Sequence, residues 1–73
     1  MQTAVVYVGD RLKRLRIRNA LTQAELAAKA GLTTATVARI ERNETEPHMS
    51  TIRKLARAFD VEPRVLVEGE DHA

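Results

Sequence analysis

The chain has 73 residues, of which 44% are apolar and 30% charged, as is ordinary for one small folded domain. A chain this short buries only about 60% of its unfolded surface, which leaves no room for a large enclosed substrate pocket with a catalytic apparatus. It has no cysteine, and its two histidines, His48 and His72, lie far apart, so we expect no disulfide, no metal site, no cofactor and no enzymatic activity.

The net charge of +2 is distributed unevenly along the chain. Residues 1–59 carry a net charge of +6 and residues 60–73 a net charge of −4, and nine of the twelve cations are arginine. Arginine suits bidentate contacts with phosphates and base edges, although a basic face is by itself more often only a solvated surface. No apolar run approaches the ~18 residues of a membrane span and no signal peptide is visible, so we expect a cytoplasmic protein.

The first two segments differ in their apolar pattern. Residues 1–8 are mainly apolar and rich in β-branched side chains, which predicts an extended segment. Residues 9–19 place Leu12 and Leu15 in one stripe at helical spacing, which predicts a helix. Asn19 tolerates the left-handed conformation and is expected to end this helix.

A second helix is expected up to about residue 30. Thr22 and Glu25 have the spacing of a capping box, in which each side chain accepts a hydrogen bond from the backbone N–H of the other residue. Gly31 then supplies the left-handed residue that commonly follows a helix.

A third helix is expected over residues 34–42, with Thr33 as its N-cap. At about 100° per residue this helix has an inward stripe and an opposite, outward stripe. Asn43 is expected to end it in the left-handed conformation. The inward stripe consists of Val37, Ile40 and Glu41, and the outward one of Ala35, Arg39 and Arg42.

Two further helices complete the expected fold. A fourth helix is predicted over residues 49–59, with His48 or Ser50 as its cap, and a fifth over residues 63–67, with proline at its first position. The polar tail, residues 68–73, is expected to be disordered. The sequence therefore predicts an all-α domain of five short helices around one core.

The second and third helices are separated only by residues 31–33, which is the spacing of a helix-turn-helix. The third helix buries one stripe, so the other is free to enter a major groove ~12 Å wide. Thr34, Ala35 and Ala38 are small and allow the backbone to approach base edges. Arg39 is the long donor on that stripe, and its fork matches the O6 and N7 acceptors of guanine.

Five stretches at characteristic spacing carry a closer resemblance. They are Gly9–Arg16, Leu21–Ala27, Gly31–Thr33, Val37–Arg42 and Pro47. In these stretches the chain resembles the Cro/repressor-type (XRE-like) helix-turn-helix family over residues 9–67. The resemblance implies a five-helix lambda-repressor-like DNA-binding domain, preceded by the extended segment 1–8 and followed by the tail 68–73.

The resemblance also implies roles for individual residues. Gln23, at the start of the second helix, would hold a DNA phosphate together with the free amides of that helix. Residues at base-contacting positions of the family are Thr34, Ala35 and Arg39, and residues at backbone-contacting positions are Thr36, Arg42 and Asn43.

Arg16 and Glu41 are opposite charges on two core-facing stripes. An unpaired buried charge is costly, so the two are expected to pair with each other, and the family resemblance also implies an ion pair at these positions. The alternative is that Arg16 reaches past the core to a phosphate.

The chain departs from the family pattern in three respects, two single positions and one loop. Ala20 and Asn43 stand where the family often has glycine. The loop after the third helix is often basic in the family, whereas Glu44 and Glu46 are acidic here and would repel phosphate.

The function implied is sequence-specific binding of double-stranded DNA by a small transcriptional regulator. One recognition helix reads too few base pairs to find a site in a genome, so a homodimer on a near-palindromic operator is expected, paired through residues 65–67 or through residues 1–8. The setting stays open between a Cro-like repressor, a restriction–modification controller, and an antitoxin with a toxin partner. A protein-interaction module that does not bind DNA is the alternative of another class.

Overall fold

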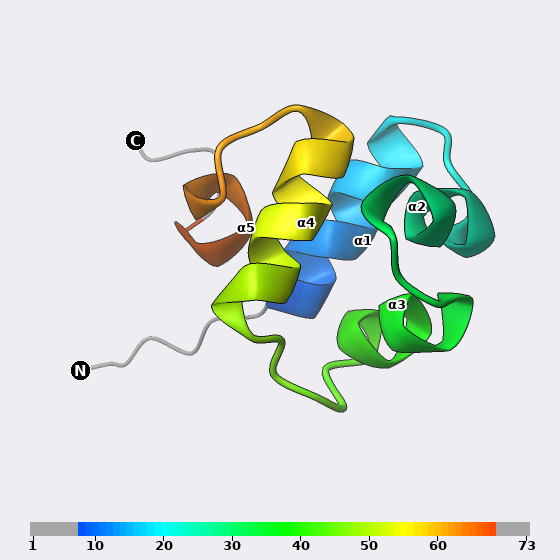
Figure 1. Cartoon of the computed structure of the whole chain (residues 1–73), viewed down its shortest axis with the longest axis horizontal. Coiled ribbons are helices and arrows are strands. Elements are labelled where there is room, and N and C mark those ends of the chain that lie inside the picture. The colour runs from blue at the N-terminus through cyan, green and yellow to red at the C-terminus, as the bar shows by residue number, and fades with distance from the viewer. Residues whose placement is uncertain (1–7, 69–73) are drawn as a thin grey trace.

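A computed structural model describes residues 8–68 of the chain, and this part is all-helical (Figure 1). The helices are α1 (Val8–Arg18), α2 (Gln23–Ala30), α3 (Thr34–Glu41), α4 (Met49–Phe59) and α5 (Arg64–Glu68). In Figure 1, α4 lies in front of α1, with α5 on one side and the α2–α3 pair on the other. The predicted all-α class with five helices is confirmed.

The helix boundaries differ from the predicted ones mainly at the two ends. Val8, expected in an extended segment, opens α1 instead, because its side chain is buried on the same stripe as Leu12 and Leu15. Glu68, expected in the tail, is the last residue of α5. The remaining predictions for residues 1–7 and 69–73 fall outside the described residues.

Three helices begin at the residues that the sequence predicts. The capping box of α2 is present: the Glu25 backbone N–H donates to Thr22 Oγ1 at 3.0 Å, and the Thr22 N–H donates to Glu25 Oε1 at 2.8 Å. Thr33 caps α3 by accepting from the Thr36 N–H at 3.1 Å. His48 occupies the N-cap position of α4, as predicted, but its side chain makes no capping hydrogen bond.

Four helices end in a left-handed residue, and only one of these residues is glycine. They are Ala20, Gly31, Asn43 and Asp60, with φ between 57° and 72°. The prediction for Asn43 is confirmed, whereas the prediction for Asn19 is wrong. The left-handed turn after α1 falls one residue later, because the Leu21 N–H reaches back to the Arg16 carbonyl at 3.1 Å and the Ala20 N–H to the Ile17 carbonyl at 2.9 Å.

The core lies where α1, α2, α3 and α4 meet, and α5 closes it from the side of α1 and α4. Every helix supplies at least one fully buried or nearly buried apolar side chain. This burial stabilises helices that would be too short to be stable in isolation. The buried apolar residues are Val8, Leu12, Leu15, Leu26, Ala27, Ala30, Val37, Ile40, Ile52, Leu55, Ala56 and Leu66.

The start of α1 packs closely against the end of α3. A Cβ atom on Gly9 would overlap the carbonyl oxygen of Ile40 and lie 2.7 Å from Asn43 Oδ1, so only glycine fits at this crossing. The Gly9 N–H donates to Asn43 Oδ1 at 3.2 Å, which satisfies one of the free amides at the start of α1. These contacts hold the end of α3 in a fixed position relative to the core.

Candidate nucleic-acid interface

The α2–α3 pair presents one side of α3 to solvent on a rigid support. Val37 and Ile40 are buried on its inner side, and Glu41 is 7% exposed. The three residues between the helices include Gly31 in the left-handed conformation, which turns the chain sharply. α3 therefore lies along one edge of the molecule (Figure 1). Its outer stripe is exposed at Thr34, Ala35 and Arg39.

The outer stripe of α3 carries the residues that the sequence predicts to read bases. Thr34, Ala35 and Arg39 are all exposed, and Ala38 is half-buried. The small side chains in the first turn leave the backbone accessible, and Arg39 stands alone as a long donor one turn later. The structure thus brings these three residues onto one accessible surface.

A polar network joins α1, α2 and α3 beneath that surface. Arg16 Nε donates to Glu41 Oε2 at 2.6 Å and Arg16 Nη2 donates to Glu41 Oε1 at 3.0 Å, with side chains only 13% and 3% exposed. The pKa of Arg16 is raised, chiefly by the hydrogen bond to Glu41. Arg16 Nη1 also donates to the Leu21 carbonyl at 2.8 Å. The expected partners are therefore paired, and the guanidinium is engaged within the protein.

Gln23 belongs to the same network, which the sequence did not predict. Its Nε2 donates to Glu41 Oε1 at 3.0 Å. An amide nitrogen has two hydrogens, so one remains for a further acceptor. Gln23 is thus held at the start of α2 by the same carboxylate that holds Arg16.

Thr36 is held by the residue that caps its helix. Thr33 Oγ1 accepts from the Thr36 N–H, and its hydroxyl donates to Thr36 Oγ1 at 2.9 Å. Because the Thr36 oxygen accepts in this pair, its own hydroxyl hydrogen is left to donate elsewhere.

Arg42 and Asn43, predicted to contact the DNA backbone, both have partners inside the protein. Arg42 Nε donates to Glu44 Oε2 at 2.7 Å. The Asn43 side chain accepts from the Gly9 N–H and donates from Nδ2 to Asp10 Oδ1 at 3.2 Å. The Asn43 amide thus links the end of α3 to α1, a role that residue spacing alone does not reveal.

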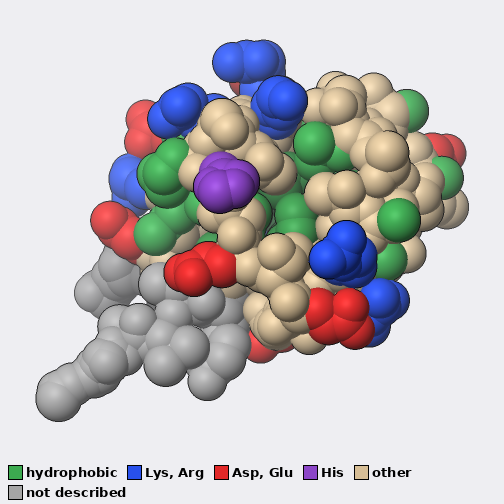
Figure 2. All heavy atoms as spheres, turned by 60° about the horizontal axis from the view of Figure 1, so that its bottom comes forward, with side chains coloured by type: hydrophobic (Ala, Val, Ile, Leu, Met, Phe, Trp, Pro, Cys, Tyr) green, Lys and Arg blue, Asp and Glu red, His purple; other side chains and the backbone are tan. Residues whose placement is uncertain are grey.

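The face around α3 is mixed in charge and not uniformly basic. Figure 2 shows positive and negative side chains next to one another on this side. A shallow hollow of about 220 Å³ lies between α3 and the start of α4. Its lining is mainly polar and consists of Thr36, Arg39, Ile40, Thr45, Glu46, Pro47, His48 and Thr51.

Residues 8–68 contain neither a cluster of metal-ligating side chains nor a helix of membrane-spanning length and hydropathy. Over this range, no three histidine or acidic side chains come together as metal ligands would. None of the helices described is both long and apolar enough to span a bilayer.

Comparison of the sequence with models of known protein families shows to which family this chain belongs. The helix-turn-helix family model matches residues 12–66, three quarters of the chain. The chain belongs to the helix-turn-helix family. Its relatives include an immunity repressor of Bacillus phage phi105, 39% identical over 64 residues, with 88% of this chain and 44% of the repressor covered. This confirms the resemblance to the Cro/repressor type.

A second relative in the family is the antitoxin HigA1 of Mycobacterium tuberculosis, 36% identical over 59 residues, with 81% of this chain and 40% of the antitoxin covered. The chain therefore spans less than half the length of these two curated relatives.

Solved helix-turn-helix structures share the fold closely. The restriction–modification controller protein C.AhdI of Aeromonas hydrophila is 41% identical, with a TM-score of 0.80 and with 84% of this chain and 92% of that chain covered. The c2 repressor of phage P22, solved in complex with a synthetic operator, is 28% identical, with a TM-score of 0.80 and with 93% of this chain and all of that chain covered.

Proposed function

We propose that this chain is a transcriptional regulator that binds a specific sequence of double-stranded DNA, with α3 in the major groove and with residues 9–67 as the DNA-binding domain. The observation that carries the proposal is the uncovered outer stripe of α3, small in its first turn and ending in Arg39, on a fixed helix pair. The P22 repressor, which shares the whole fold, was solved on an operator. Like other members of this regulatory family, the chain would bind DNA without catalysing a reaction. It would act in the cytoplasm, where its DNA target lies.

Base reading is assigned to the outer stripe. Arg39 would donate two hydrogen bonds to the O6 and N7 atoms of a guanine, while Thr34 and Ala35 would contact neighbouring base edges, Ala35 by packing on a thymine methyl. All three are exposed on one helix, within reach of the same groove.

Contacts with the DNA backbone are assigned to four residues around this stripe. Gln23 would use its second amide hydrogen, together with the free amides of α2, to bind a phosphate, and Thr36 its free hydroxyl hydrogen. Arg42 would bind a phosphate through its guanidinium. Asn43 keeps a second hydrogen on Nδ2, but this nitrogen already donates to the Asp10 carboxylate, whose charge repels a phosphate, so its contact would be the weakest of the four.

A homodimer on a near-palindrome completes the proposal. Two recognition helices about one turn of DNA apart, ~34 Å, would read two half-sites. The C-terminal side favours this pairing, because Val65 and Val67 are only partly buried against the core and leave apolar surface open. Leu66, the third residue of the expected surface, is fully buried and belongs to the core instead. The alternative route through residues 1–8 involves mainly residues outside the described range.

Each of the three biological settings is supported by a relative. Similarity to the immunity repressor of phage phi105 favours a Cro-like repressor, and similarity to a controller protein favours a role in a restriction–modification operon. Similarity to HigA1 favours an antitoxin that also binds a toxin. A protein-interaction module without DNA binding is less favoured, because the outer stripe of α3 is small and ends in arginine instead of being acidic or bulky.

The test is a binding titration of the full chain with two duplexes of equal length and composition. One carries the DNA immediately upstream of its own gene and the other a shuffled version. Binding at least about a thousandfold tighter to the upstream duplex at physiological salt would support a sequence-specific regulator. Equal binding to both would remove the sequence-specific part of the proposal, and binding to neither would favour the protein-interaction module.

A further inference from the structure

The loop after α3 places an acidic side chain beside the arginines of the recognition helix. Asn43 turns the chain in the left-handed conformation, and the Glu44 N–H donates to the Arg39 carbonyl at 3.0 Å. This bond and the bond from the Asn43 N–H to the Ile40 carbonyl at 2.9 Å form the closing pair of a helix end. Glu44 is therefore held against the last turn of α3 by its backbone.

The Glu44 carboxylate occupies one edge of the Arg42 guanidinium. Arg42 Nε donates to Glu44 Oε2 at 2.7 Å and Arg42 Nη2 donates to Glu44 Oε1 at 3.2 Å, a two-bond arrangement that a phosphate could equally adopt. The two side chains are 58% and 51% exposed.

The pKa values of Glu44 and Arg42 shift in the directions that this pairing implies. The hydrogen bond from Arg42 lowers the pKa of Glu44, and the positive charge of Arg39 lowers it further. The same hydrogen bond raises the pKa of Arg42. At neutral pH, Glu44 is thus an anion that interacts electrostatically with both Arg42 and Arg39.

We propose that Glu44 is an internal competitor with DNA phosphates for the Arg42 guanidinium, and that it weakens the sequence-independent part of DNA binding. The proposal rests on the proposed function. While the pair is closed, Arg42 and Glu44 together contribute no net charge to the attraction of a duplex. An exposed pair of this kind is weak, so a phosphate can displace the carboxylate, but each displacement lowers the net gain in affinity.

Such a competitor suits a regulator that must leave non-operator DNA quickly. Phosphate contacts provide essentially all of non-specific affinity, whereas base contacts provide discrimination. Because Glu44 acts on Arg42 and only at longer range on Arg39, its effect falls mainly on the phosphate contacts.

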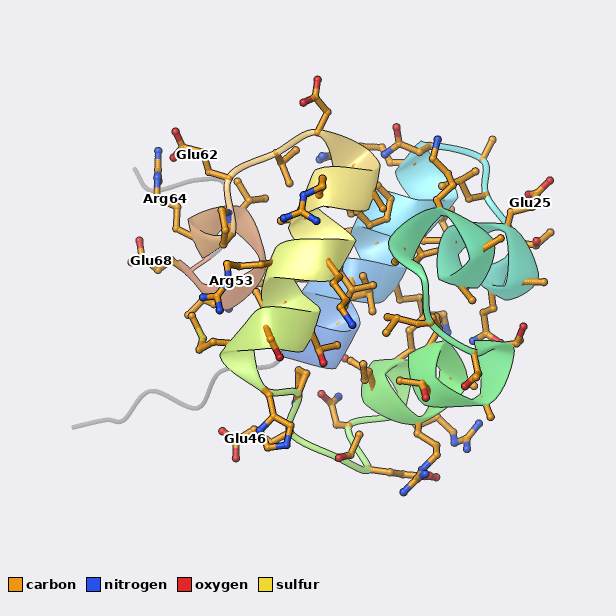
Figure 3. The ribbon with its side chains drawn as sticks, viewed as in Figure 1. Glu25, Glu46, Arg53, Glu62, Arg64 and Glu68 are labelled. Atoms are coloured by element: carbon orange, nitrogen blue, oxygen red, sulfur yellow. The ribbon has the colours of Figure 1, made fainter. Side chains whose placement is uncertain are left out.

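A second ion pair in the same protein provides a matched control. Glu62 and Arg64 are also two residues apart, Arg64 Nε donates to Glu62 Oε1 at 2.9 Å, and the side chains are 72% and 61% exposed. Figure 3 shows this pair beside α5, on the opposite side of the molecule from α3. Glu62→Gln removes the same charge as Glu44→Gln without touching the recognition helix.

The experiment measures the affinity of the full chain for a shuffled duplex over about 50 to 200 mM salt. The proteins are the wild type, Glu44→Gln, Arg42→Gln, the double variant and Glu62→Gln. Glu44→Gln should bind several-fold tighter than wild type at the lowest salt. The slope of log affinity against log salt should stay close to that of the wild type, because Arg42 contacts one phosphate in both proteins.

In the Arg42→Gln background, Glu44→Gln should give a much smaller gain and no change of slope. A gain of equal size in that background would show simple repulsion and overturn the competition. Unchanged or weaker binding by Glu44→Gln would also overturn it, as would an equal gain from Glu62→Gln. If the wild type binds neither the shuffled nor the upstream duplex, the proposed function fails together with this inference. If the wild type binds and Glu44→Gln gains nothing, only this inference fails.

Discussion

At the scale of single residues, the left-handed helix ends show strain that a substitution can remove. An L-residue with a side chain is disfavoured by about 1–2 kcal/mol in this conformation, less for asparagine and aspartate because their side chains bond locally. Ala20 has φ of 57° and has no such polar side chain, whereas Gly31 has φ of 72° without any Cβ.

We predict that Ala20→Gly stabilises the protein by about 0.5–1 kcal/mol. Relief of the left-handed strain exceeds the added flexibility of glycine in the unfolded chain. The reverse change, Gly31→Ala, should destabilise by about 1 kcal/mol through backbone strain alone, because no atom outside its chain neighbours lies within 4 Å of the Cβ it would gain. Urea denaturation measures both changes. Loss of stability in Ala20→Gly would show that the Ala20 side chain contributes packing.

A second prediction concerns the carboxylate shared by Arg16 and Gln23. Glu41→Ala should lower the free energy of unfolding by about 3–5 kcal/mol, because it leaves a guanidinium that is 13% exposed without its main partner. Thermal unfolding followed by circular dichroism measures the loss. Glu44→Ala, at an exposed pair, is the control and should unfold almost as the wild type does. Similar stability of the two variants would mean that water readily replaces Glu41.

At the scale of elements, α3 would separate the two proposed kinds of DNA contact along its length. Ala35 and Arg39 lie on the outer stripe of the helix itself. Arg42, which the sequence placed on the same stripe, is the C-terminal cap and lies beside Glu44. Base contacts and phosphate contacts respond differently to DNA sequence and to salt, so binding measurements can distinguish the two arginines.

We predict that Arg39→Ala weakens operator binding by about 1–3 kcal/mol and relaxes the preference mainly at one guanine. Arg42→Ala should weaken binding to all sequences alike and lower the salt slope by about one unit. Titrations with operator variants substituted one base pair at a time measure both effects. Equal losses on operator and shuffled DNA for both variants would contradict the assignment of Arg39 to bases.

At the scale of the whole molecule, the tertiary contacts connect the two proposed surfaces. Gly9 and Asn43 join α1 to the end of α3, and Arg11 on α1 donates to the carbonyls of Leu66 and Val67 at the end of α5. α1 thus fixes both the recognition helix and the helix proposed to pair two copies, so the distance between two recognition helices is set by a rigid body.

We predict that the paired substitution Val65→Glu and Val67→Glu yields monomers and weakens operator binding, while shuffled DNA is bound almost as before. The charges would be buried without partners in a two-fold interface. Sedimentation measures the mass, and circular dichroism shows whether the helices persist, because both valines also pack on the core. A wild type that is monomeric both free and on its operator would contradict the dimer.

The sequence by itself determined the features that depend on neighbours within about one helical turn. The capping box at Thr22, the cap at Thr33 and the left-handed Gly31 and Asn43 follow from local hydrogen bonding, and helical periodicity brought Glu41 to the buried stripe that meets Arg16. The α3 stripe was predictable for the same reason, because spacing alone sets which residues share a face.

Only the tertiary structure decided which polar groups already have partners. The bonds from Gly9 to Asn43, from Gln23 to Glu41 and from Arg11 to the end of α5 join residues 18 to 56 positions apart, which no local pattern encodes. The left-handed turn moved from Asn19 to Ala20 because the backbone bonds that close α1 outweigh the preference of one side chain. Hydrogen-bonding capacity is a property of residue type, but its use depends on which groups packing brings within about 3 Å.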